Sequence, residues 1–207
     1  MTNRSETEDR RFPHAVMIVL AIALAAACLL PVHPASALLL PTEEPGPRVR
    51  AYVQWNQDYL SLAAKVPDLM VTGSSVVPMS AAERDDAIEF SFEIPGQRPP
   101  FPAYRLIISA AGGMTLFTRD PGGRWRPDDS WTTGAQTIKY AVQVNGTLND
   151  PMDQDTAFVV ECAIPWDLLH GVLVEGPDIG FNVACWMRGD SEGVASWAPT
   201  VRAPEDV

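Results

Sequence analysis

Residues 149–169 read NDPMDQDTAFVVECAIPWDLL, an acidic loop followed by an apolar run that ends at Pro165 and Trp166. Apolar residues on alternate positions of a short run predict a strand with one face in a core. Pro165 is expected to end the strand, because proline has no N–H to donate to a neighbouring strand, and Trp166 to close the end of the core. The side chains expected to face that core are Val160, Cys162 and Ile164.

Similar runs occur along most of the chain and predict an all-β fold. Asn-Gln-Asp and Gly-Gly segments between paired runs are typical of hairpin turns, and short strands at regular spacing predict an antiparallel β-sandwich or a jelly roll. Brief helical turns are expected at residues 80–83 and 166–170. The predicted strands lie within residues 48–66 (two around Asn56–Asp58), 86–94, 104–120 (two around Gly112-Gly113), 137–146, 158–166 and 178–189.

The N-terminus has the pattern of a secretory signal. Residues 1–14 are polar with two adjacent arginines, and residues 15–30 are an unbroken apolar stretch. This stretch is shorter than the roughly 20 residues that span a bilayer as a helix. Ala35-Ser36-Ala37 places small residues where a signal peptidase reads them. We therefore expect a signal peptide over residues 1–37 and no membrane span in the mature chain.

Two other interpretations of the N-terminus remain open. Cys28 follows three alanines, so lipidation at Cys28 is one of them, and an uncleaved anchor is the other. Either way the protein is expected outside the cytoplasm, secreted or periplasmic. After a proline-rich leader over residues 38–47, residues 48–207 are expected to form one domain.

The charge balance limits the classes of partner. The net charge is −11 and no basic stretch is present, which argues against nucleic acid and anionic lipid. Two cysteines, Cys162 and Cys185, remain in the mature chain. Both lie in apolar runs, so a disulfide between them and two free buried thiols are equally expected.

Catalytic patterns are weak. The sole histidine of the mature chain is His170, and no serine lies in a Gly-x-Ser-x-Gly segment. The two cysteines and His170 also lack the spacing of a zinc site. Hydrolysis of a glycoside needs only two carboxylates, for which Asp86 and Glu89 are candidates. Because Glu89 alternates outward on its strand, a solvent-facing glutamate is the expected alternative.

The acidic loop offers oxygen ligands of the kind that calcium takes, from Asp150, Asp153 and Asp155. It lacks the glycine and the distal glutamate of an EF-hand loop. Aspartates also form turns by accepting hydrogen bonds from nearby backbone N–H groups. We favour such turns over calcium and keep calcium as the alternative.

Tryptophans suggest a surface on which sugar rings could stack. Trp125, Trp131, Trp186 and Trp197 lie in late loops and strand ends, where flat rings bind sugars at small entropic cost. Trp186 is the strongest candidate, because alternation puts it on one face with Asn182 and Arg188. For Trp166 and Trp197 we expect core positions instead.

Three segments in order resemble the carbohydrate-binding module family 9-like domains, part of the wider DOMON-like β-sandwich group. DDAIEF (85–90) is similar to an acid-x-Val-Glu strand, and VECAIPW (160–166) to a Glu-x-Ala-Ile-Pro-Trp strand end. GFNV (180–183), followed by Ser196-Trp197, is similar to a Gly-Phe-Asn strand and a Ser-Trp-x-Pro segment. The order and spacing agree over residues 48–200, and the resemblance implies a secreted, noncatalytic sugar-binding sandwich, some members of which hold structural calcium.

The resemblance also implies site residues. Glu89 and Arg105 fall where family members hydrogen-bond sugar hydroxyls. The chain departs from the pattern where a sugar-sandwiching tryptophan is replaced by Glu83 and a glutamine by Ala184. A second stacking tryptophan and the usual closing strand have no counterpart, so we expect either a truncated gene product or a partner that completes the sheet edge.

The sequence therefore predicts noncatalytic binding of an oligosaccharide or polysaccharide. Alternatives are a haem-binding relative with Met79 or Met114 as axial ligands, a secreted glycosidase, and a structural module of the envelope. We expect no haem and no resident cofactor, with calcium the one exception kept open. The predicted ligand-binding residues are Glu89, Arg105, Trp186, Arg188 and Asp86.

Overall fold

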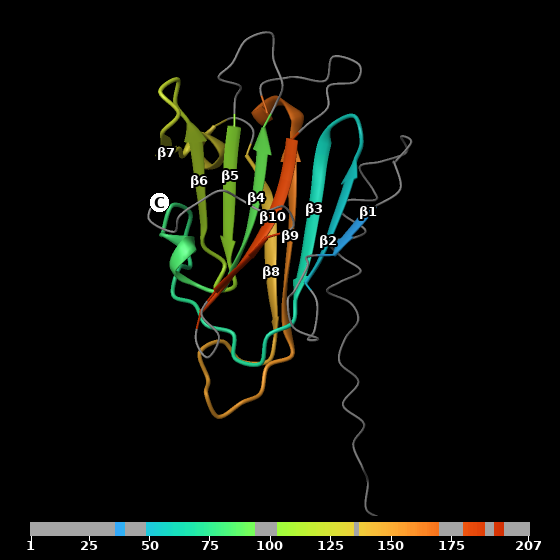
Figure 1. Cartoon of the computed structure of the whole chain (residues 1–207), viewed down its shortest axis with the longest axis vertical. Coiled ribbons are helices and arrows are strands. Elements are labelled where there is room, and N and C mark those ends of the chain that lie inside the picture. The colour runs from blue at the N-terminus through green and yellow to red at the C-terminus, as the bar shows by residue number, and fades with distance from the viewer. Residues whose placement is uncertain are drawn as a thin grey trace, which may run out of the picture. The chain divides into compact units, whose positions relative to one another are not determined.

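Short alternating runs of apolar residues build two antiparallel sheets in the computed structural model of the chain (Figure 1). The structure describes residues 36–39, 49–93, 103–134, 137–169, 180–188 and 193–196. Contacts divide the chain into Met1–Val32 and His33–Val207, and every described residue belongs to the second unit. Residues 1–35 of the predicted signal peptide, which include Cys28, lie outside the described residues, as do His170 and Trp197.

The first sheet has the strand order β1-β2-β3-β9-β8. The predicted hairpin around residues 56–58 is confirmed, and the strand that ends at Pro165 pairs with its second arm from Tyr59↔Pro165 to Val66↔Phe158. The members are β1 (Ser36–Leu39), β2 (Arg50–Trp55), β3 (Tyr59–Val66), β8 (Lys139–Asn145) and β9 (Ala157–Pro165).

The second sheet has the order β11-β10-β4-β5-β6-β7, again with antiparallel pairs throughout. The predicted hairpin at Gly112-Gly113 joins two of its strands, and Gly112 takes the positive φ of +95°. The members are β4 (Ala87–Glu93), β5 (Ala103–Ser109), β6 (Met114–Arg119), β7 (Trp125–Pro127), β10 (Gly180–Met187) and β11 (Gly193–Ser196).

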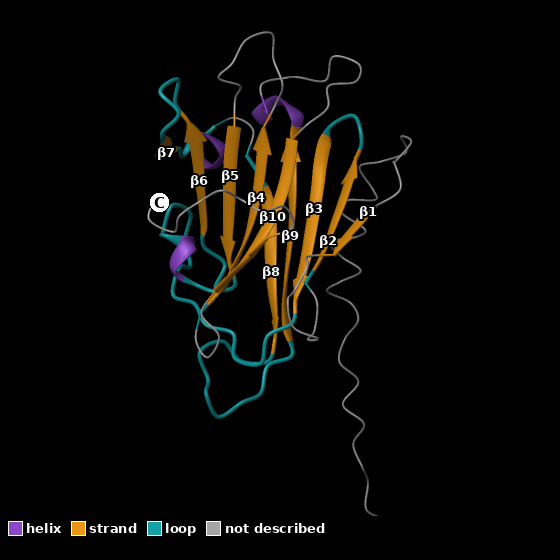
Figure 2. Cartoon of the chain, viewed as in Figure 1, coloured by secondary structure: helices purple, strands orange, loops and turns teal. Residues whose placement is uncertain are grey.

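Helical structure is sparse in the described residues (Figure 2). The expected turns are confirmed as the 3-10 helices η1 (Ala82–Arg84) and η2 (Trp166–Leu169). The sequence missed β1, β7, β11 and the short helix α2 (Ser130–Thr133). Among the described residues, no helix is both long and apolar enough to cross a membrane.

The main core lies between the two sheets and confirms the predicted β-sandwich. Val160, Cys162 and Ile164 of β9 are buried in it, as predicted, together with Phe90 of β4 and Cys185 of β10. Both thiols are free in this structure, and burial raises the pKa of each.

The predicted end of the sandwich is also confirmed. Trp166 is buried, and its Nε1 donates a hydrogen bond of 2.8 Å to the carbonyl of Asn56. Pro165 is the last residue of β9. The hairpin turn and the strand end are therefore joined by one indole.

A second, smaller cluster covers the other side of the six-stranded sheet. Its buried residues come from that sheet and from η1, and Trp125 packs against them. We call this side, which faces away from the five-stranded sheet, the outer face. The cluster consists of Ala82, Ala87, Ile107, Phe117 and Trp186.

Candidate functional site

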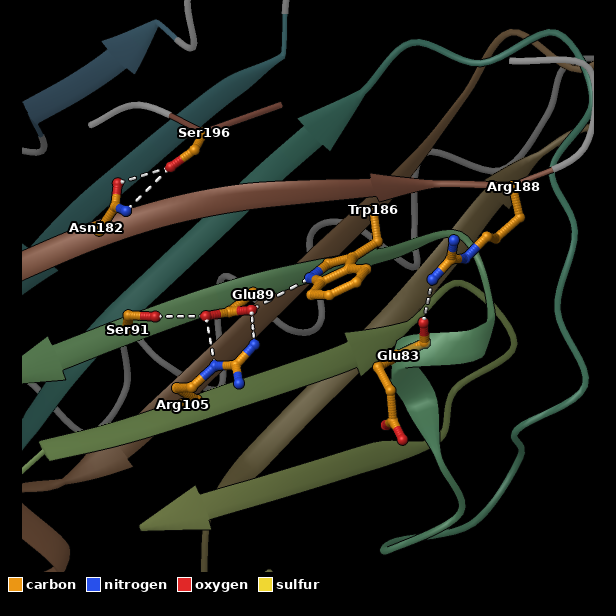
Figure 3. Close-up of polar contacts among 8 residues, drawn as sticks. All are labelled: Glu83, Glu89, Ser91, Arg105, Asn182, Trp186, Arg188 and Ser196. Carbon is orange, nitrogen blue, oxygen red and sulfur yellow. Dashed lines mark hydrogen bonds and ion pairs between the residues drawn. The ribbon is translucent and has the colours of Figure 1, made fainter. Parts of the chain in front are cut away.

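Glu89 and Arg105 form an ion pair on the outer face (Figure 3). Glu89 lies in the middle of β4, where alternation turns it away from the core residues Ile88 and Phe90. Arg105 lies on the neighbouring strand β5, opposite Ser91. The predicted outward direction of Glu89 is confirmed, but its predicted solvent exposure is wrong, because the residue is only 5% exposed.

Among the described residues, four hydrogen bonds from three side chains hold the Glu89 carboxylate. Arg105 donates Nε to Oε1 at 2.9 Å and Nη2 to Oε2 at 2.8 Å. Ser91 Oγ donates to Oε1 at 2.6 Å, and Trp186 Nε1 donates to Oε2 at 3.2 Å. A carboxylate offers about four acceptor positions, so these donors saturate it and fix its orientation.

Arg105 is also held by aromatic rings. Its guanidinium carbon lies 5.8 Å from the ring centre of Phe117 and 5.5 Å from that of Trp125. Arg105 is 2% exposed. The ion pair and the two rings together fix the position of the guanidinium.

Trp186 lies on the outer face, as predicted, but not as an exposed platform. The residue is 8% exposed, and its indole both packs in the smaller cluster and donates to Glu89. Arg188 stacks over the same indole at 5.4 Å and donates Nη2 to the carbonyl of Glu83 at 2.8 Å. The two residues therefore support the ion pair from one side.

Asp86 was predicted to bind ligand, and the structure corrects this. The residue is fully buried and accepts hydrogen bonds from the backbone N–H and hydroxyl of Thr72 and from the backbone N–H of Arg188. Burial raises the pKa of Asp86 above its ordinary value, although these hydrogen bonds oppose the rise. Asp86 ties a loop to the end of β10 and does not lie on the outer face with Glu89.

Trp125 and Trp131, both predicted as candidates for a sugar-stacking surface, differ in how far they are buried. Trp131 is in α2 and 2% exposed, and its ring centre lies 5.2 Å from that of Tyr104. Trp125 is half-buried on β7 and contacts the outer face. Trp125 is therefore the more accessible of the two indoles beside the ion pair, the other being Trp186.

Polar residues that the sequence prediction did not assign extend the site. Asn182 on β10 donates Nδ2 to Ser196 Oγ on β11 at 3.0 Å. Arg119 on β6 pairs with Glu93 on β4 at 2.7 Å, and these side chains are 25% and 45% exposed. Alternation along β4 would have placed Glu93 on the same face as Glu89. Its pairing with Arg119 could not have been predicted in the same way, because it depends on the order of the strands in the sheet.

The acidic loop behaves as the favoured turn interpretation predicted. Asp150 and Asp153 each accept a hydrogen bond from a nearby backbone N–H, those of Met152 and Gln154. Asp155 differs, because it is 1% exposed and accepts hydrogen bonds from the backbone N–H groups of Val71 at 2.6 Å and Thr147 at 2.8 Å. Across the described ranges, no three His, Cys, Asp or Glu residues gather as metal ligands would.

The methionines considered as haem ligands lie elsewhere in the fold. Met114 is fully buried in the main core between the sheets. Met79 has a positive φ of +63° in the loop before η1, and its backbone N–H donates to the carbonyl of Met114 at 2.5 Å. Neither residue belongs to the outer face.

Comparison with known proteins supports the fold. No protein-family model matches the chain, and no curated protein matches it in sequence. A crystal structure from Bacteroides uniformis, described as that of a "putative carbohydrate-binding protein", is similar with a TM-score of 0.63 and 14% sequence identity. The match covers 89% of this chain and 83% of that chain. At this identity the likeness shows a shared fold, and the resemblance to family 9-like and DOMON-like domains stays a prediction.

Proposed function

We propose that the chain is a noncatalytic carbohydrate-binding module and that the outer face of the six-stranded sheet binds the glycan. The observation that carries this proposal is the buried Glu89–Arg105 pair, with a saturated carboxylate, on a face on which the described strands pack no second sheet. The similar fold of the Bacteroides uniformis protein, described as carbohydrate-binding, supports the proposal.

Glu89 and Arg105 on the outer face are buried, unlike the charged residues on the outward side of the five-stranded sheet. On the outward side of the five-stranded sheet, Lys65, Lys139 and Glu161 are simply exposed, as expected for a solvated surface. Burying an ion pair costs desolvation free energy that packed apolar residues would not incur. A buried network that fixes the Glu89 carboxylate with several donors is therefore better explained by a need for fixed geometry, and binding sites have that need.

The chemistry of the outer face suits hydroxyl-rich ligands. Half-exposed Ser91 and Asn182 provide a hydroxyl and an amide beside the ion pair, and Trp125 provides a flat apolar surface. Sugars combine hydroxyl groups with apolar ring faces, which such mixed sites recognise.

The same network argues against hydrolysis. A general acid needs a carboxyl group whose proton can reach the substrate. Glu89 accepts from Arg105, Ser91 and Trp186, and Asp86 is buried beneath the loop at Thr72. The carboxylates of Glu89 and Asp86, considered for a glycosidase, thus serve as acceptors of structural hydrogen bonds.

A glycan array followed by titration tests the proposal. We expect at least one class of oligosaccharide to bind and to change tryptophan fluorescence, because two indoles, those of Trp125 and Trp186, lie beside the ion pair. Ser91→Ala should weaken binding about fivefold, the effect of one hydrogen bond worth about 1 kcal/mol. The matched control, Glu161→Gln on the opposite side of the sandwich, should leave affinity unchanged.

Two results would count against a glycan-binding outer face. The first is a folded wild-type protein that binds no glycan on the array. The second is binding that Glu161→Gln weakens as much as Ser91→Ala does, since the ligand would then contact the other sheet.

A further inference from the structure

We propose that the ligand is a chain of several sugars that runs across the strands, from β10 to β7, and not a single sugar held at the ion pair. This inference rests on the proposed glycan binding and adds the ligand's extent and direction. It depends on a row of half-exposed side chains, which we call the cross-strand strip. The strip consists of Ser196, Asn182, Ser91, Glu93, Arg119 and Trp125.

Strand register places the strip residues in two neighbouring rows. In one row, Asn182 on β10 lies opposite Ser91 on β4, and Ser91 lies opposite Arg105 on β5. In the next row, Glu93 on β4 lies between two small residues, Gly180 on β10 and Ala103 on β5. In the same row, Arg119 on β6 lies opposite Trp125 on β7. The strip is therefore continuous across the sheet.

Exposure separates the strip from the network beneath it. Glu89, Arg105 and Trp186 are 5%, 2% and 8% exposed, whereas every residue of the strip is partly exposed. The buried residues thus hold the strip in place through the hydrogen bond from Ser91 to Glu89 and the cation–π contact of Arg105 with Trp125. A ligand would touch mainly the strip.

The length of the strip exceeds one sugar ring. From β10 to β7 there are four strand-to-strand steps in the order β10-β4-β5-β6-β7. Neighbouring strands lie about 4.8 Å apart, so the strip extends over about 19 Å. A monosaccharide could contact one end of the strip or the middle, but not both ends.

The ends of the strip also differ in chemistry, which suits successive sugars. At the β10 end, the Asn182 amide and the Ser196 hydroxyl both donate and accept hydrogen bonds. In the middle, the Glu93–Arg119 pair passes over the small Ala103 and offers charged acceptors and donors. At the β7 end, Trp125 offers an aromatic surface.

Affinity as a function of chain length tests this inference. The probe is a length series, from monosaccharide to hexasaccharide, of the sugar that the array identifies. We expect affinity to rise with each added sugar over the first several units and then to level off, with the longest chain at least about tenfold tighter than the monosaccharide, because contacts at separate strands add.

Variants at the two ends make the test specific. Asn182→Ala and Trp125→Ala should each weaken binding of the longest chain by at least about fivefold, whereas a disaccharide, too short to reach both ends, should respond to at most one of them. Gln143→Ala, exposed on the five-stranded sheet, is the matched control and should change nothing. Thermal melting of each variant confirms that it is folded.

The outcomes separate the two proposals. If a monosaccharide binds as tightly as the longest chain, or if only one end of the strip affects the longest chain, the cross-strand arrangement is wrong while glycan binding stands. If no sugar of any length binds the folded protein, both proposals fail.

Discussion

Two adjacent carboxylates, Asp85 and Asp86, show how strongly the surroundings of a residue decide its chemistry. Both are almost completely buried just before β4 begins at Ala87. Burial alone would raise the pKa of Asp85. Hydrogen bonds from Ser109 Oγ at 2.6 Å and the Ser75 backbone N–H at 2.8 Å lower the pKa by more, so the pKa lies below the ordinary value of 3.8. At Asp86 burial prevails and the pKa lies above 3.8.

Asp85→Asn should destabilise the protein by about 1–3 kcal/mol at pH 7, because buried donors lose a charged acceptor. A carboxyl group whose folded pKa is lowered contributes stability above its unfolded pKa, near 3.8, and this stability is lost as pH falls through the lower folded value. The difference between variant and wild type should therefore shrink at pH 3. Urea unfolding at both pH values measures it, with exposed Asp129→Asn as control. A difference that grows toward acid would refute the assignment.

Asp155→Ala should cost about 2–4 kcal/mol of unfolding free energy, since it leaves the backbone N–H groups of Val71 and Thr147 without their acceptor. Asp153→Ala, which changes an exposed turn residue, should stay within about 0.5 kcal/mol of wild type. Urea denaturation compares the two.

The alternative of calcium in this loop has its own test. With turns alone we expect the melting temperature to be unchanged by EDTA and by added calcium. A melting temperature that falls with EDTA and recovers with calcium would instead support a site that includes Asp150, Asp153 and Asp155.

At the scale of elements, alternation was a reliable guide wherever one face of a strand meets the core. The strands at 86–94 and 158–166 were predicted from apolar residues at every second position, and β4 and β9 confirm them. β7 is three residues long and α2 four, too short for any periodic pattern. Their placement depends on contacts with distant residues, such as Trp131 with Tyr104.

The candidate site was only partly predictable for the same reason. Alternation placed Glu89 on the outward side of β4, but its burial depends on Arg105 and Trp186, which are remote in sequence. The pairing of β4 with both β5 and β10 brings them together. No local pattern contains that information.

The β5–β6 hairpin provides a test at the same scale. Gly112 has a φ of +95°, and a Cβ there would meet no atom within 4 Å. Gly112→Ala should therefore destabilise the protein through backbone strain alone, by about 1–3 kcal/mol. Gly193→Ala, where φ is not positive and a Cβ would also meet no atom within 4 Å, is the matched control for thermal melting. Equal melting temperatures for the two variants would contradict the hairpin geometry.

At the scale of the whole molecule, the two sheets each contribute one thiol to the shared core. Cys162 comes from β9 and Cys185 from β10, and burial raises the pKa of both, which disfavours the reactive thiolate. We expect a thiol reagent to modify both cysteines at least about 10³-fold more slowly in native buffer than in urea, because modification requires unfolding. Fast native labelling of either cysteine would contradict the core, and a mass two hydrogens lower would reveal a disulfide.

The short strand β1 has a practical consequence for anyone who produces this protein. It pairs with β2 from Ser36↔Val53 to Leu39↔Arg50 and so shields the backbone of that strand. A recombinant chain that begins at Leu38, the start expected after signal cleavage, would lack Ser36 and Ala37 and leave much of β2 as an open edge beside exposed Tyr52 and Trp55. Open edges recruit strands from other molecules. A chain that begins a few residues before Ser36 should accordingly be the better behaved at high concentration.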